Sequence, residues 1–328
     1  MALLNWRKEL PLFGAVLGLI LILGVGNAAF FSLDNLADLL RNSIVIGIMA
    51  LGVMVVMASG GIDVSFTAIA IFSAYATTRL LLETGGGESI VLAFVSAAFL
   101  GSILGLINAL FIAWLRLPTL IVTLGTLSLF RGAMLTFLGS EYITALPNSM
   151  VAFSRWDLVT GLTSGGSTYR VPVAFLALPL TAVLVSLLLN RTYWGRGIYA
   201  IGGDRESAER AGFATAGLQT FIYCFVGALS ALAGMIHVTL GRIANPFDLV
   251  GMELNVIAAV VLGGARLTGG YGSVTGTLLG VALIVMINNS LILLGVPSFW
   301  QRVVVGLLIL IGAGTTVVRG RALRGVRT

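Results

Sequence analysis

The sequence predicts an all-α, polytopic integral membrane protein that forms one transmembrane domain over residues 1–328. Hydrophobic residues make up 58% of the chain and charged residues only 10%, whereas a soluble domain carries about 25% charged residues. Such a chain cannot cover a water-facing surface. The apolar sequence also divides into segments of about 20 residues, the length that a helix needs to cross a bilayer.

Ten segments have the composition of membrane spans. They are Leu12–Phe31, Asn42–Ser59, Ile62–Leu82, Ile90–Leu115, Thr119–Gly139, Val171–Asn190, Leu218–Leu240, Met252–Leu262, Ser273–Leu294 and Trp300–Val318. The eighth is too short to cross a bilayer without its neighbours. The first segment follows Arg7 and Lys8 and looks somewhat like a secretory signal, but the many later spans favour an uncleaved first helix.

Arginine and lysine residues near the span ends predict the orientation, because they are enriched in cytosolic loops. Counting ten crossings from a cytosolic N-terminus puts twelve of them in the cytosol and six outside. We therefore expect both chain ends in the cytosol. Ser140–Arg170 is then a periplasmic segment, and Arg191–Gly217 is a cytosolic loop.

That cytosolic loop, Arg191–Gly217, is a polar stretch in an otherwise apolar sequence and contains its densest run of charges. We call it the polar island. A turn is expected at Gly202–Asp204, with Asp204 capping a helix of about two turns, Arg205–Ala211. Glu206 and Arg210 are four residues apart and can pair. A charged helix between spans has no lipid role, so it predicts a docking surface for a soluble partner. The residues assigned to it are Arg196, Gly202, Gly203, Asp204, Glu206, Ala208, Glu209, Ala211 and Gly212.

Two glycine-rich stretches, Ser59–Ser65 and Gly263–Gly272, interrupt apolar runs. Glycine permits sharp turns, and Asp63 and Ser65 can cap the helix that follows the first stretch. This first break is either a cavity-lining turn or an ordinary cytosolic connection. The helix breaks are assigned to Gly60, Gly61, Gly263, Gly264, Gly269 and Gly270.

Polar side chains within spans are candidates for a solute pathway. Those assigned to it are Asp63, Asn108, Thr123, Thr126, Asn255, Asn288 and Asn289. The alternative is that they bond neighbouring helices to one another. Arg131 and Glu253 also lie within spans, and Arg131 is expected to snorkel or to pair with Glu141. Small residues, including Gly101, Gly105 and Gly227, predict close helix packing.

Several chemistries are excluded by what the chain contains. It has one histidine and one cysteine, so no zinc site is expected. Its only lysine is Lys8, so there is no Walker motif and no ATP site of that kind. No catalytic cluster is visible, and the scattered arginines do not suit nucleic acid. We expect a non-enzyme without cofactors or metal on this chain.

Four stretches together resemble the permease subunits of bacterial ABC importers for monosaccharides, the ribose, xylose, arabinose and autoinducer-2 group. They are SGGIDVS at 59–65, the run from Asn108 through Pro118–Thr126 to Gly132, GRGIYAIGG at 195–203, and the glycine-rich run from Val261 to Thr277. The sequence departs from that family at Phe66–Thr67, where Val-Gly is usual, at Asp204, where Asn is common, and at Ala211–Phe213, where Ser-Gly-Ile is usual.

The resemblance implies an importer subunit in the bacterial inner membrane that carries a monosaccharide or similar small polyol. Its implied partners are an ATP-binding subunit dimer that holds ATP and Mg, a second permease subunit, a periplasmic solute-binding protein and the surrounding lipid. Gly202–Gly212 would be the helix that couples to the ATPase. One alternative is an ion- or proton-coupled secondary carrier of a small polar solute, which would need no partner at that helix. Another is a membrane enzyme or scaffold, which would need a catalytic cluster.

Overall fold

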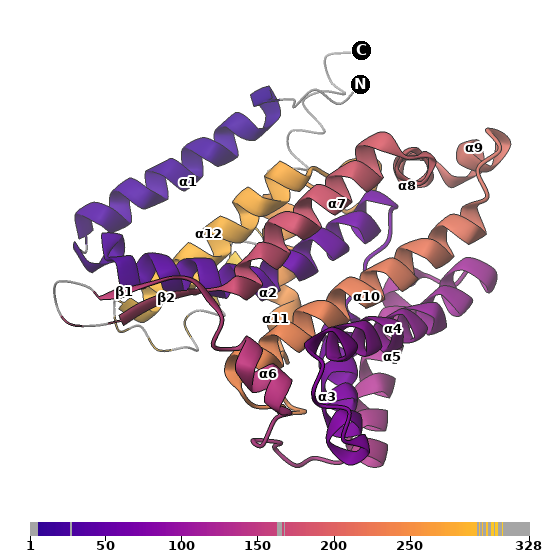
Figure 1. Ribbon diagram of the computed structural model, residues 1–328. Coiled ribbons are helices and arrows are strands. Elements are labelled where there is room, and N and C mark those ends of the chain that lie inside the picture. The colour runs from indigo at the N-terminus through magenta and orange to yellow at the C-terminus, as the bar shows by residue number, and fades with distance from the viewer. Residues whose placement is uncertain are drawn as a thin grey trace.

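The computed structural model describes residues 6–26, 28–162, 166 and 168–293, together with eight positions between 295 and 310. The described chain is mainly helical (Figure 1). Its elements are α1 (Trp6–Gly26), η1 (Ala28–Phe31), α2 (Leu33–Ala58), α3 (Phe66–Thr84), α4 (Ile90–Ala109), η2 (Leu110–Trp114), α5 (Thr119–Ala133), η3 (Met134–Leu138), α6 (Asn148–Phe153), β1 (Asp157–Leu162), β2 (Thr168–Pro172), η4 (Val173–Leu176), α7 (Ala177–Arg191), α8 (Tyr193–Gly203), α9 (Arg205–Arg210), α10 (Thr215–Gly241), α11 (Met252–Leu262) and α12 (Val274–Leu293).

Six of the described helices are long and apolar enough to cross a membrane. They are Leu33–Ala58, Ile90–Trp114, Thr119–Leu138, Val173–Arg191, Thr215–Gly241 and Val274–Leu293. Two shorter apolar helices lie at Glu9–Val25 and Met252–Leu262. The chain is therefore a multi-pass membrane protein, as predicted, while the ten-span count stays a prediction. The predicted span at residues 300–318 falls largely outside the described residues.

Two predicted span starts were wrong. Helix α2 begins at Leu33, nine residues before the predicted start, because the Ser32 hydroxyl caps it by accepting from the Asn35 N–H at 3.2 Å. Helix α3 begins at Phe66, four residues after the predicted start, because residues 61–64 have no regular secondary structure and lie outside the helix.

The helices run between two ends of the molecule. The island end carries the polar island, the end of α2 and residues 263–272, and the Gly270 N–H bonds to the Ala58 carbonyl at 3.0 Å there. The hairpin end carries the β1–β2 hairpin, whose antiparallel register pairs Leu162 with Thr168. Figure 1 shows α8 and α9 at one side of the molecule and the hairpin at the other. The sequence did not predict this hairpin.

The start of α1 lies at the island end. There the Glu9 carboxylate accepts hydrogen bonds from the Ser273 hydroxyl and, at 2.7 Å, from the Thr275 hydroxyl near the start of α12. Helices α1 and α12 also pack side by side (Figure 1). The beginning of the described chain and the polar island are therefore on the same side of the bundle.

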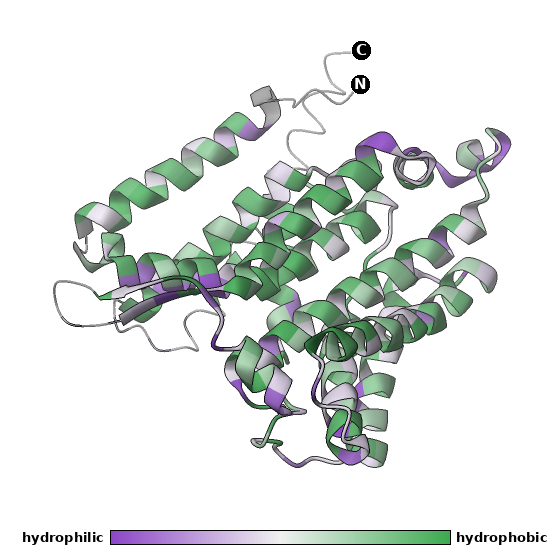
Figure 2. Ribbon diagram, viewed as in Figure 1, coloured by the Kyte–Doolittle hydropathy of each residue, from purple (hydrophilic) through white to green (hydrophobic). Residues whose placement is uncertain are grey.

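Helix α2 lies at the centre of the core, and every residue from Ile46 to Ala58 is buried. Hydrophobic residues cover most of the long helices, whereas hydrophilic ones gather around α8 and α9 (Figure 2).

Helix α10 packs closely on α4 through small residues. A Cβ at Gly105 would overlap the Tyr223 carbonyl, and one at Gly101 would overlap the Gly227 carbonyl. The prediction of close packing through small residues is confirmed.

Candidate functional site

The polar island folds into two short helices, α8 and α9, joined at Asp204. The Thr192 hydroxyl caps α8 by accepting from the Gly195 N–H at 3.1 Å. Gly202 and Gly203 form the last residues of α8, so the predicted turn at these two glycines was wrong. Helix α8 was not predicted because four of its first five positions after the cap are aromatic or glycine, which are poor helix formers.

Helix α9 has the predicted cap. The Asp204 carboxylate accepts from the Ser207 N–H at 2.7 Å, and hydrogen bonding from Ser207, through its side chain and then its backbone, lowers the pKa of Asp204. The helix ends at Arg210, and Gly212 follows with φ +87°. This left-handed conformation favours glycine, so the predicted role of Gly212 as the helix stop is confirmed.

Helix α9 is anchored to the protein by one buried residue and exposes its charged side chains to solvent. Ala208 is buried against Ile201 and Leu218, whereas the Glu206 side chain is 85% exposed and lies 3.8 Å from the Arg210 guanidinium. The Glu209 carboxylate accepts from the Thr215 hydroxyl at 2.7 Å, and this bond is the main cause of its lowered pKa. The outer face of α9 is therefore a charged surface that Ala208 and Glu209 hold in place, with Glu206 and Arg210 exposed to solvent.

The structure places the predicted docking residues on two sides of this unit. Those that are exposed are Arg196, Gly203, Asp204, Glu206, Glu209, Ala211 and Gly212. Gly202 and Ala208 are buried and instead fix the island to the rest of the protein.

Three glycine-containing segments meet beneath α8 at what we term the glycine junction, made of Gly60, Gly202, Gly269 and Gly270. A Cβ at Gly202 would overlap the Ala58 carbonyl oxygen, and one at Gly269 would lie 2.5 Å from the Gly202 carbonyl oxygen and 2.7 Å from the Gly60 Cα. Only glycine permits backbones to approach this closely. The polar island is thus joined directly to the end of α2 and to the loop before α12.

The remaining predicted breaks have distinct roles. Gly263 ends α11 and packs on Gly276, whose carbonyl oxygen would lie 2.6 Å from a Cβ at Gly263, and Gly264 follows with φ +87°. Gly61 faces the Tyr223 hydroxyl, which would lie 2.9 Å from an added Cβ. All six glycines assigned to helix breaks therefore lie between helices.

The segment between α2 and α3 runs along α5 inside the protein. The Ile62 N–H donates to the Thr119 hydroxyl at 3.0 Å, and the Thr123 hydroxyl donates to the Ile62 carbonyl at 3.2 Å. Since every residue from 61 to 65 except Ile62 is buried, protein encloses this irregular backbone, the condition under which a membrane protein tolerates backbone outside regular helices.

Three predicted pathway residues, Asp63, Asn108 and Thr126, form one buried hydrogen-bond network with Ser65. A fourth, Thr123, joins it through its backbone carbonyl, which accepts from the Thr126 hydroxyl at 3.4 Å. The Asp63 carboxylate accepts from both the N–H and the hydroxyl of Ser65 at 2.7 Å, and the Asn108 amide donates to the Ser65 hydroxyl at 2.8 Å. The Thr126 hydroxyl donates to the Asn108 amide oxygen at 2.6 Å. Asp63, Asn108 and Thr123 are at most 1% exposed, so this network bonds α3, α4 and α5 together. The expected helix cap by the Ser65 side chain is absent, because its hydroxyl donates to Asp63.

The other three predicted pathway residues lie elsewhere. Asn255 is partly buried on α11, and Asn288 and Asn289 are partly buried near the end of α12. The structure therefore does not bring the seven predicted residues into one site.

A second polar cluster, the Thr67–Arg131–Glu253 trio, was not predicted as a unit. The Arg131 guanidinium lies 3.7 Å from the Glu253 carboxylate, and the Thr67 hydroxyl lies 3.4 Å from each of these side chains. The expected pairing of Arg131 with Glu141 was wrong, because Arg131 turns toward α11. Sequence reasoning singled out two members, and the signal for the third was the departure from the family pattern at Phe66–Thr67.

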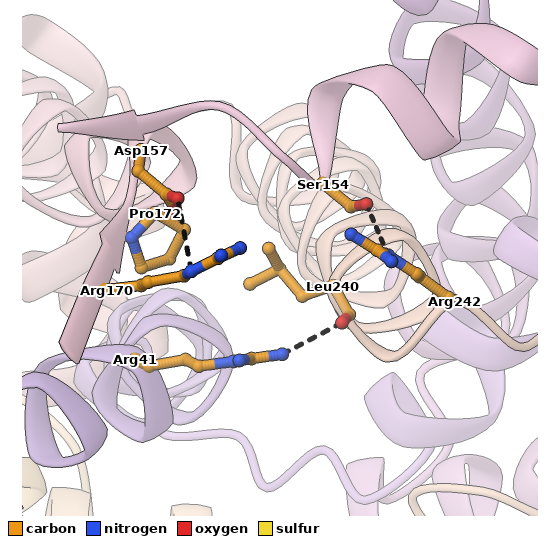
Figure 3. Close-up of a pocket in the computed structure, with 7 residues that line it drawn as sticks. All are labelled: Arg41, Ser154, Asp157, Arg170, Pro172, Leu240 and Arg242. Atoms are coloured by element: carbon orange, nitrogen blue, oxygen red, sulfur yellow. Dashed lines mark hydrogen bonds and ion pairs between the residues drawn. The ribbon is translucent and has the colours of Figure 1, made fainter. Parts of the chain in front are cut away.

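A cavity of about 150 Å³ opens at the hairpin end (Figure 3). Its charged lining consists of Arg41, Arg170 and Arg242 with one carboxylate, that of Asp157. Hydrogen bonds fix two of the guanidinium groups, Arg41 on the Leu240 carbonyl at 2.9 Å and Arg242 on the Ser154 hydroxyl at 2.8 Å. The cavity therefore has an excess of positive charge.

Comparison with known proteins identifies the family. The family model described as a branched-chain amino acid transport system/permease component matches residues 35–313, which include every site described above. The chain belongs to this permease family. Among its relatives are the autoinducer 2 import system permease proteins LsrC of Yersinia enterocolitica and Yersinia pestis, each 33% identical over 94% of this chain and covering 81% and 83% of their own lengths.

These matches confirm the predicted resemblance to transport permeases, and this permease is a transport subunit rather than an enzyme. The family description and the relatives' names refer to different solutes, so membership alone does not assign a solute to this permease. No solved structure matches the chain.

Proposed function

We propose that this permease is the membrane subunit of an ATP-driven importer that carries a monosaccharide or similar small polyol across the bacterial inner membrane. The observation that carries the proposal is the polar island, which presents the charges of α9 to solvent and is joined through the glycine junction to α2 and to the loop before α12. The autoinducer 2 import function named for the relatives supports the same class of transport.

In the proposed orientation, the island end faces the cytosol and the hairpin end faces the periplasm, with ten spans and both chain ends inside. The island then docks on an ATP-binding subunit, two of which bind ATP and Mg. A second permease subunit, either another copy or a related chain, completes the membrane part. The periplasmic solute-binding protein docks at the hairpin end, where the excess arginine of the cavity in Figure 3 suits acidic side chains.

The chain's own contribution to transport is mechanical. When ATP binding and hydrolysis change the spacing of the ATP-binding subunits, α9 moves with its docking partner. Ala208 couples α9 to α8, and the glycine junction couples α8 to the end of α2. Because these contacts are tightly packed, displacement of the island is transmitted to the membrane helices, and the solute cavity changes the side to which it opens.

Co-purification in mild detergent followed by mass spectrometry tests this proposal. We expect an ATP-binding subunit to accompany the tagged wild-type permease and to be lost with Glu206→Arg, which reverses the charge on the most exposed part of α9. Glu88→Arg is the matched control, since it makes the same charge change at an exposed position that precedes α4 at the opposite end.

If the Glu206→Arg variant still co-purifies with the ATP-binding subunit, α9 is not the docking element. Recovery of the permease alone, together with uptake into reconstituted vesicles that lack ATP, would favour the secondary-carrier alternative. Once the partners are known, uptake of labelled pentoses and of autoinducer 2 identifies the solute.

A further inference from the structure

The Thr67–Arg131–Glu253 trio joins three separate elements near the middle of the bundle. Arg131 lies twelve residues beyond the first residue of α5, and Glu253 lies nine residues before the last residue of α11. At 1.5 Å per residue these side chains lie about 18 Å and about 14 Å from the island end. Since the hydrocarbon core is about 30 Å thick, both charges lie near the membrane midplane.

The two charged side chains are partly open to the surroundings. The Arg131 side chain is 23% exposed and that of Glu253 is 17% exposed. Exposed apolar residues flank them, with Leu129 57% and Leu254 56% exposed. Ionisable side chains at this depth almost always face a water-filled path or a protein neighbour, because exposure to lipid is costly.

The bonds within the trio are long. The distances of 3.4, 3.4 and 3.7 Å exceed the roughly 2.7–2.9 Å of a strong charge-assisted hydrogen bond. An arginine has five N–H donors, and among the described residues Arg131 uses one of them, toward the Thr67 hydroxyl. Its Nε is buried, so the donors left for a third group are those of the two terminal nitrogens. The closest bond to the Glu253 carboxylate comes from the Gly251 N–H at 3.0 Å, which fixes its position at the start of α11. The trio therefore keeps donors and acceptors available to a third group.

The chemistry of the trio suits a neutral solute with adjacent hydroxyl groups. A guanidinium donates to hydroxyl oxygens, a carboxylate accepts from hydroxyl hydrogens, and the threonine hydroxyl does both. A lone anionic solute would be repelled by Glu253, and a cationic one by Arg131. A polyol satisfies both side chains without an uncompensated charge.

We propose that Thr67, Arg131 and Glu253 form a solute-binding site at the membrane midplane, facing the transport path, and that they bind vicinal hydroxyls of a neutral polyol. This site rests on the transport function proposed above and adds to it the residues that recognise the solute. It differs from the buried network around Asn108, whose side chains already satisfy one another.

The first test measures access to water and does not depend on the solute. The assembled transporter, carrying Cys224→Ser to remove the native thiol, is placed in lipid nanodiscs with Arg131→Cys or Glu253→Cys. A charged methanethiosulfonate reagent should label both positions at least tenfold faster than Val183→Cys, a 57% exposed position near the middle of α7. Labelling as slow as at position 183 would overturn the site.

The second test measures recognition in proteoliposomes with labelled D-ribose, D-xylose, L-arabinose and autoinducer 2. Thr67→Val removes the hydroxyl and should raise the KM for whichever of these solutes is transported about two- to tenfold, whereas Thr67→Ser, which keeps a hydroxyl, should stay close to wild type. Thr78→Val is the control, because the Thr78 hydroxyl bonds to the Ala74 carbonyl of its own helix at 2.7 Å.

A charge exchange separates solute recognition from simple helix bonding. If Arg131 and Glu253 only bond helices, Arg131→Glu combined with Glu253→Arg restores the wild-type KM, which would overturn the site. A KM that stays raised in a complex of normal yield supports it. If wild type transports none of the four solutes, the proposed function fails, whereas the labelling result still decides whether the trio faces water.

Discussion

Substitution of Gly202 by alanine tests the glycine junction with the smallest possible change. The added Cβ would overlap the Ala58 carbonyl oxygen and lie 2.5 Å from the Gly270 nitrogen, whereas an ordinary contact is about 3.5 Å. Overpacking of this kind costs about 1–3 kcal/mol. The added Cβ also pushes apart the backbone segments that carry Ala58 and Gly270. This lengthens the 3.0 Å hydrogen bond from the Gly270 N–H to the Ala58 carbonyl, which contributes about 1 kcal/mol to stability. We expect a total loss of about 2–4 kcal/mol.

Thermal unfolding of the purified permease in detergent, followed by size-exclusion chromatography, measures this loss. At roughly 2–4 °C per kcal/mol, Gly202→Ala should lower the melting temperature by about 4–16 °C. In the assembled transporter the same variant should reduce uptake more than ATP hydrolysis, because the island can then move without moving α2.

The neighbouring glycine is the matched control for this variant. Gly203 is also in α8, but an added Cβ would meet nothing within 4 Å. Alanine favours a helix by about 0.5–1 kcal/mol over glycine, so Gly203→Ala should leave the melting temperature unchanged or raise it slightly. Equal melting temperatures for the two alanine variants would refute the close backbone approach at Gly202.

Three further predictions concern other parts of the structure. Thr126→Val leaves the buried Asn108 amide oxygen without its 2.6 Å donor and should cost about 1–3 kcal/mol, seen as a lower melting temperature that Thr126→Ser does not share. Gly105→Leu should separate α4 from α10, because even a Cβ overlaps the Tyr223 carbonyl, and normal yield of folded protein would contradict this. The pKa of Asp204 is lowered from 3.8 in the folded protein, so its contribution to α9 is present above that value and is lost as pH falls through the lowered pKa. Over that acidic range the protection factors of the α9 amides, which correct for the intrinsic pH dependence of hydrogen exchange, should fall in wild type but not in Asp204→Asn, which also caps.

Features governed by neighbouring residues were predictable from the sequence. The Asp204 cap, the stop at Gly212 and the pair Glu206–Arg210 depend on residues at most four apart. The close contact of α4 with α10 followed from small residues in two apolar runs. Composition alone was sufficient to predict a multi-pass helical membrane protein.

Features governed by distant residues were not predictable. Thr67, Arg131 and Glu253 are 64 and 122 residues apart in succession, and nothing local indicates that they meet. The glycine stretches were recognised as breaks, but their convergence at Gly202 depends on how the bundle closes. Helix α8 was missed because tertiary packing overrides the weak helix propensity of its glycines.

The enclosure of residues 46–58 of α2 has a consequence for how the protein is made. Its 26 residues are apolar enough to insert into lipid, yet in the finished fold residues 46–58 touch only other parts of the protein. A membrane helix first partitions into the bilayer and later associates with its neighbours. During biogenesis α2 must therefore exchange a lipid environment for a protein one as α10, α11 and α12 are synthesised and pack around it. Its side chains must be hydrophobic enough for the helix to insert into the bilayer, and later their shapes must fit the packed core. The two requirements act on the same residues at different times.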